Sequence, residues 1–121
     1  MDRVVSIVQG RRLADTEEGS FPLAYDDLRA GDYWKVLDRE TGEPKHVDNP
    51  SNLTGLVWVV IAPGPASSRL IATLSLHTVR EREDGTIDVL PGDGSSNSIL
   101  VTRRPEESWH GYIYAGEWRP C

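Results

Sequence analysis

The feature that most constrains the fold of this sequence is the pair Asp84-Gly85, which stands between two strand-like runs at 78–82 and 87–90. A glycine-containing turn between two such runs is typical of a β-hairpin. If this pair alone formed the loop, like charges would oppose each other across the hairpin. A three-residue loop that begins one residue earlier, with Gly85 left-handed in a bulge, sets opposite charges against each other instead. We therefore predict the bulged hairpin, whose pairs are Val79 with Val89, Arg80 with Asp88, and Glu81 with Ile87.

A second hairpin is expected from the runs at 108–114 and 117–119, with its turn at Ala115-Gly116. A longer loop stays open as an alternative, because alanine is disfavoured where the turn requires a positive φ. With the shorter loop, side chains that alternate along the strand give one core face and one aromatic, polar face. The core face would carry Trp109, Ile113 and Trp118, and the opposite face His110, Tyr112 and Tyr114.

Short runs of β-branched and apolar residues predict further strands. These runs lie at 3–8, 32–37, 56–62, 69–74 and 98–102. The run at 56–62 is almost wholly apolar, which indicates a strand buried on both faces. Only 22–31 has helical spacing, for one or two turns that end at Gly31. We expect 11–21 and 38–54 to be loops, because they are polar and show no period.

Many short strands with almost no helix predict the fold class. We expect a mainly β protein, either a small antiparallel sandwich or a partly open barrel, with at most one short helix. A chain of 121 residues fits one domain and can bury a core without a metal or disulfide. The prediction is a single domain over 1–121, with a looser N-terminal part at 1–54 and a β core at 55–119.

Charge and composition limit the classes of partner. Nineteen acidic and 13 basic side chains give a net charge of −6, which disfavours binding to nucleic acid or to anionic lipid. The apolar run at 56–62 is too short to cross a membrane, and the first residues lack the apolar stretch of a signal peptide. The single cysteine, Cys121, cannot form an internal disulfide. We therefore expect a soluble, cytoplasmic protein that binds neither nucleic acid nor membranes.

The nitrogen and sulfur side chains able to hold a metal ion are few, although carboxylates are many. A zinc site needs about three protein ligands, which are usually histidine, cysteine or carboxylate side chains. The histidines and the cysteine are His46, His77, His110 and Cys121, and no two of them stand at ligand spacing. The prediction is that the protein has no metal and no cofactor.

A serine beside a histidine is the remaining catalytic candidate. Residues two apart on a strand share a face, so Ser75 could lie beside His77, and Ser108 beside His110. The sequence has no Gly-x-Ser-x-Gly elbow, and no third residue can be assigned to orient the base. A small metal-assisted or serine hydrolase that uses His77 and His110 is therefore an alternative rather than the prediction.

The aromatic face of the second hairpin is the best candidate for binding. His110, Tyr112 and Tyr114 combine apolar rings with polar atoms, which provide contact area at a low cost in conformational entropy. His77 is expected near this face. The same side chains would instead form an aromatic ladder in the interior if another loop packed over them.

Two motifs give the chain a resemblance to a known family. One motif spans 74–87, and the other spans 109–113 and closes on Gly116 and Trp118. Over about residues 55–119 the chain resembles a family of short proteins encoded by actinobacteria and their phages, whose members often carry the label ammonia monooxygenase. The copper enzyme of that name is embedded in a membrane, and this sequence has neither a spanning segment nor a clustered set of histidine ligands.

Together, the residues and the resemblance predict a phage-related accessory protein that acts as a non-catalytic binding module for a protein partner. The predicted binding residues are His77, His110, Tyr112 and Tyr114. A minor virion component is a further alternative beside the hydrolase.

Overall fold

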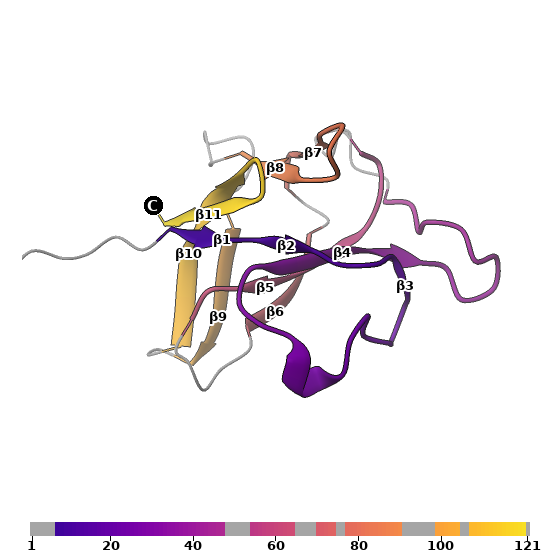
Figure 1. Ribbon diagram of the computed structural model, residues 1–121, viewed down its shortest axis with the longest axis horizontal. Helices are drawn as coiled ribbons and strands as arrows, with labels where there is room; N and C mark the ends of the chain where they lie inside the picture. Colours follow the sequence, from indigo (N-terminus) through magenta and orange to yellow (C-terminus); the bar gives the residue numbers. More distant parts are fainter. Residues whose placement is uncertain are drawn as a thin grey trace, which may run out of the picture.

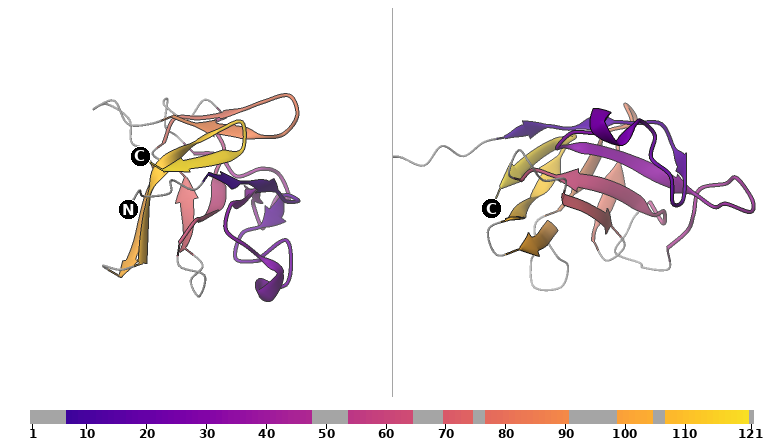
Figure 2. Two further views of the ribbon diagram at one scale, coloured as in Figure 1. Left: turned by 60° about the vertical axis from the view of Figure 1, so that its left-hand side comes forward. Right: turned by 90° about the horizontal axis from the view of Figure 1, so that it is seen from below.

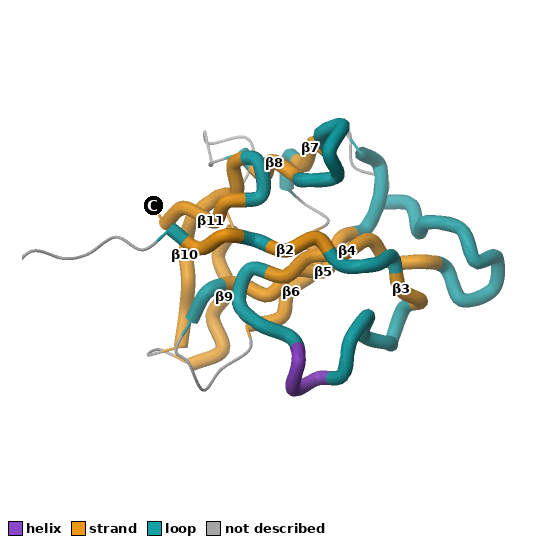
Figure 3. The backbone as a smooth tube through the Cα atoms, viewed as in Figure 1, coloured by secondary structure: helices purple, strands orange, loops and turns teal. Residues whose placement is uncertain are grey.

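The computed structural model confirms the mainly β prediction. It describes residues 7–47, 54–64, 70–74, 77–90, 99–104 and 107–120. Within these ranges the strands form two mostly antiparallel sheets, and the helical structure consists of a 3-10 turn, η1 (Tyr25–Asp27). Figure 3 shows strand and loop along nearly all of the traced chain. None of the described residues belongs to a helix that is long and apolar enough to span a membrane.

The first sheet contains six strands and is antiparallel throughout its pairings. Its order is β1 (Val8–Gln9), β11 (Glu117–Pro120), β10 (Glu107–Tyr114), β8 (Ile87–Val89) and β7 (Val79–Glu81), and β9 (Ile99–Arg104) also pairs with β10. Both predicted hairpin registers are confirmed, because Val79 pairs with Val89 and Ile113 pairs with Trp118. Gly85 has a φ of 88°, as the bulged loop requires.

The second sheet contains five strands. Its order is β2 (Arg11–Arg12), β4 (Asp32–Leu37), β5 (Trp58–Ala62) and β6 (Leu70–Leu74), and β3 (Thr16–Glu17) also pairs with β4. Strand β5 is antiparallel to both β4 and β6, whereas β2 and β3 run parallel to β4. The strands predicted at 32–37, 56–62 and 69–74 are therefore confirmed, with small shifts at their ends.

The prediction of a loop at 11–21 was wrong, because this segment contains β2 and β3. These strands are held by the backbone of β4: Leu13 N–H donates to the Tyr33 carbonyl at 2.9 Å, and Glu18 N–H donates to the Leu37 carbonyl at 3.0 Å. Two-residue strands that depend on a distant partner leave no periodic pattern in the local sequence. The strand predicted at 3–8 lies mostly outside the described residues, and its last residue, Val8, begins β1.

The strands of the two sheets cross steeply. In Figure 1, β4, β5 and β6 run across the picture, whereas β9 and β10 run down it. Figure 2 shows the chain passing from β1 into β2 almost without a break, so that residues 8–12 belong first to one sheet and then to the other. Orthogonally packed sheets form such corners where one strand changes sheet.

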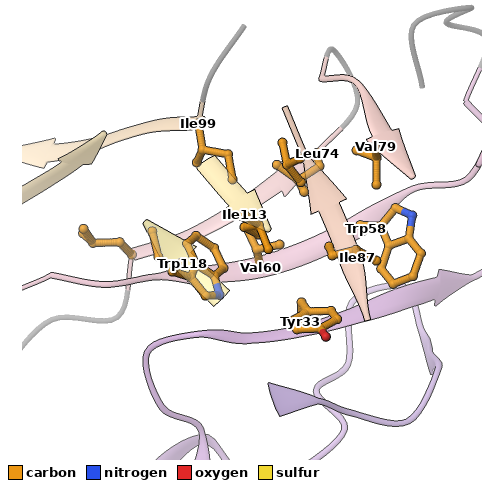
Figure 4. Packing of buried hydrophobic residues seen from close by; sticks show 12 residues of the cluster. Tyr33, Trp58, Val60, Leu74, Val79, Ile87, Ile99, Ile113 and Trp118 are labelled. Atoms are coloured by element: carbon orange, nitrogen blue, oxygen red, sulfur yellow. The ribbon is translucent and has the colours of Figure 1, made fainter. Parts of the chain in front are cut away.

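The main hydrophobic core lies between the two sheets (Figure 4). Val79 and Val89 of one hairpin and Ile113 and Trp118 of the other are each at most 1% exposed. Burial of a side chain of this size stabilises the fold by about 1.5–3 kcal/mol. Further members, from both sheets, are Tyr33, Trp58, Val60, Leu70, Leu74, Ile87 and Ile99. A smaller cluster of Leu28, Trp34 and Ile61 covers the opposite face of the second sheet.

Three glycines meet at the corner where the chain changes sheet. Gly10 N–H donates to the Gly116 carbonyl at 2.8 Å, and the indole N–H of Trp118 donates to the Gly31 carbonyl at 3.0 Å. A Cβ at Gly10 would lie 2.3 Å from the Gly116 carbonyl oxygen and 3.0 Å from that of Gly31. The corner therefore requires a residue without a side chain at Gly10.

We expect Gly10→Ala to lower the free energy of unfolding by about 3 kcal/mol, the upper part of the range for overpacked sites, because backbone atoms must move to admit the methyl group. Gly42→Ala is the matched control, since Gly42 has a φ of 74° but no atom within 4 Å of the added Cβ. Backbone strain alone should cost about 1 kcal/mol there. Urea denaturation of both variants measures the difference, and an equal loss would contradict the proposed close approach.

Candidate functional site

The candidate binding residues of β10 lie on the outer side of the first sheet. Trp109 and Ile113 pack in or against the core, so the alternate residues of the same strand face away from it. These alternate residues are Ser108, His110, Tyr112 and Tyr114. Ser108, His110 and Tyr114 are exposed and Tyr112 is half-buried, so no described loop packs this row into the interior.

Tyr114 is held between two guanidinium groups. Its ring centroid lies 4.8 Å from Cζ of Arg82 and 5.3 Å from Cζ of Arg119. The ring is nevertheless 52% exposed. A cation over an aromatic ring at an exposed position is worth about 0.5–1 kcal/mol, which is enough to favour one orientation of the ring. The two arginines thus hold the Tyr114 ring in one orientation, although about half of its surface is open to solvent.

Asp88 anchors Arg82, one of the two arginines that contact this ring. Its carboxylate is 2% exposed and accepts hydrogen bonds from Arg80 Nη2 at 2.7 Å, from Arg82 Nε at 3.0 Å and from the backbone N–H of Ala115 at 2.7 Å. Burial raises the pKa of Asp88, but the bonds from Ala115 and the two arginines outweigh that effect, so the pKa lies below its ordinary value of 3.8. The bound carboxylate therefore remains ionised at neutral pH.

The same carboxylate stabilises the turn between β10 and β11. Ala115 has a φ of 50°, the unfavourable conformation that left a longer loop as an alternative, yet the turn contains only Ala115 and Gly116. The hydrogen bond from Ala115 N–H to Asp88 offsets part of the cost of this conformation. Turn geometry and the position of Tyr114 consequently depend on one buried side chain.

Leu100 extends the surface beyond the aromatic row. It pairs with His110 across β9 and β10, and it is 65% exposed. Side chains of paired residues lie on the same face, so Leu100 and His110 are neighbours. We call the surface formed by Leu100, His110, Tyr112, Tyr114, Arg82 and Arg119 the β10 face.

His77 lies apart from the other predicted binding residues in the strand order of the sheet. It is half-buried in a bend that precedes β7, and β8 lies between β7 and β10 in the strand order. The sheet brings Ser108, His110, Tyr112 and Tyr114 onto one strand face, but it does not bring His77 into that row.

The other catalytic and metal candidates do not form a recognisable site. Ser75 and Cys121 lie outside the described residues, and His46 is exposed in an isolated bridge with Leu56. Within the described part of the chain, no three histidine, cysteine, aspartate or glutamate side chains are arranged to hold a metal ion. Ser108 and His110 share an exposed face that lacks the enclosed setting usual for an activated serine.

Three residues of the β10 face were not predicted as binding residues. Arg119 could have been found from the predicted pairing with Tyr112, which is confirmed. Leu100 and Arg82 belong to other strands or turns, and only the pairing of β9 and the contact between the hairpins place them beside the tyrosines.

No protein-family model, curated protein or solved structure matches this chain.

Asp88→Asn should destabilise the protein by about 2 kcal/mol at pH 7, because hydrogen bonds to an ionised group are lost. The folded-state pKa is lowered, so the contribution of Asp88 is fully present above its unfolded pKa and disappears as the pH falls through the folded pKa. The difference between the parent protein and the variant should therefore be greatest above about pH 5 and shrink below about pH 4. Urea titrations from neutral to acid pH measure it, and a difference that stays constant with pH would refute this role.

Proposed function

We propose that the protein is a non-catalytic binding module that contacts a protein partner through the β10 face. The position of Tyr114, half-exposed between Arg82 and Arg119, is the observation that best supports the proposal. Tyrosine and arginine are enriched among the residues that contribute most to the affinity of protein interfaces. Side chains that are already oriented lose less entropy on binding.

The shape and chemistry of the β10 face also support a protein partner. Leu100 supplies an exposed apolar group, and His110 and Tyr112 follow it along the same face. Such a combination of apolar, aromatic and polar side chains on a sheet surface suits a flat protein interface better than an enclosed small-molecule site. The arginines favour a partner surface that carries carboxylates, because opposite charges across an interface favour association.

The biological setting that we propose comes from the resemblance to proteins of actinobacteria and their phages. In that setting the protein is a soluble accessory protein, and its partner lies in the bacterial cytoplasm. Neither nucleic acid nor a membrane is part of the proposal, because the net charge of −6 opposes both.

Tyr112→Ala should leave the fold intact and weaken binding to the partner by a factor of about 30, equivalent to the loss of one interface hot spot. The measurement is capture of partners from an extract of an actinobacterial host on the immobilised protein, followed by titration of the captured partner. Tyr25→Ala is the control, because Tyr25 is a tyrosine that is 45% exposed and lies on η1, outside the β10 face. Equal capture by the parent protein and by Tyr112→Ala would count against the proposal.

A catalytic role can be tested independently of any partner. If the proposal is correct, purified protein contains less than one equivalent of any transition metal. The Ser108→Ala variant should also hydrolyse activated esters at the same background rate as the parent protein. Elemental analysis and a chromogenic ester assay measure these quantities. A stoichiometric metal, or a rate that depends on Ser108 or His110, would favour the hydrolase.

A further inference from the structure

A pocket of about 380 Å³ opens on the outer face of the second sheet, away from the β10 face. Its floor is apolar and comes from adjacent strands and the residue before β5: Trp34, Val36, Val57 and Val59. Thr73 of β6 and the turn that follows β3 complete the wall. The volume falls within the range of small-molecule sites, which are mostly apolar with a few placed polar groups.

The charged groups that line the pocket are the carboxylates of Glu17 and Glu18 and the ammonium group of Lys45. Lys45 Nζ lies 2.5 Å from the Glu18 carboxylate, and this hydrogen bond lowers the pKa of Glu18 and raises that of Lys45. Lys45 is therefore already paired. Glu17 is held less closely, because its ion pair with Arg39 is 3.5 Å long and both side chains are more than half exposed.

This arrangement favours a cation over an anion in the pocket. Lys45 already donates to Glu18, so a ligand carboxylate that bound its remaining N–H donors would lie close to the carboxylates of Glu17 and Glu18. A ligand ammonium group could instead bind Glu17, whose exposed pair with Arg39 contributes little and exchanges readily. The net charge of −6 acts in the same direction.

We propose that this pocket binds a small organic cation, an amine joined to an aromatic or aliphatic body. The body would lie on the apolar floor, and the ammonium group would pair with Glu17. The site goes beyond the proposed partner surface and uses none of its residues, so either proposal can fail while the other stands.

The test uses three probes of similar size: 2-phenylethylamine, its neutral analogue 2-phenylethanol, and the anion 3-phenylpropionate. Each is titrated into the full chain while amide chemical shifts are followed by NMR. We expect saturable shifts at Gly19, Ser20 and Lys45 with the amine, with a dissociation constant on the order of 1 mM for so small a ligand. The anion should bind at least about tenfold more weakly, because it meets the two carboxylates.

Two pairs of variants locate the site. Glu17→Gln should weaken the amine about fivefold and leave the alcohol unchanged, whereas Glu40→Gln, an exposed carboxylate outside the pocket, should change neither. Thr73→Phe should fill the pocket and abolish the shifts, whereas Ile71→Phe, on the same strand face but outside the lining, should not. Equal binding of amine and anion, shifts that map elsewhere, or no saturable shift with the amine up to about 10 mM would each overturn the proposal.

Discussion

The close approach of backbones at the glycine corner is the constraint on which the rest of the structure depends. Gly10 and Gly116 are joined by a backbone hydrogen bond, and Gly31 accepts the indole N–H of Trp118 while its own N–H donates to the Ile61 carbonyl at 2.7 Å. Gly10 follows β1, Gly116 precedes β11 and Gly31 precedes β4, so these bonds connect the two sheets at one point. Because Trp118 is also fully buried in the main core, packing and hydrogen bonding fix the β10–β11 hairpin together.

Two buried aspartates hold the turns beside this corner in the same way. Asp32 is 0% exposed, and it accepts two bonds from Arg11 and one from the backbone N–H of Arg29. Asp88 accepts bonds from two arginines and from the backbone N–H of Ala115. A carboxylate removed from water is tolerated only when charged partners and N–H donors satisfy it. Each aspartate thereby ties a turn to a strand and restricts the motion of that turn.

Each sheet presents a different outer surface, because the main core lies between the two inner faces. On the first sheet the outer face carries exposed rings and arginines, which suit a broad protein contact. On the second sheet, residues that follow β3 rise beside the outer face and enclose an apolar pocket with a charged rim. The two surfaces lie on separate sheets and share no residue, so a partner and a small ligand could be bound together.

Local sequence determined the hairpins, because turn chemistry and side-chain alternation act over a few residues. Gly85 set the register of the β7–β8 hairpin, and the pleat of β10 decided that Tyr114 faces away from the core. The fold class followed from the same short-range patterns. Only the tertiary structure decided the parallel pairing of β2 and β3, the position of Arg82 against Tyr114, and the enclosure of the pocket around Val59. These features join segments that are distant in the chain, and their geometry depends on how the two sheets pack, which no local pattern encodes.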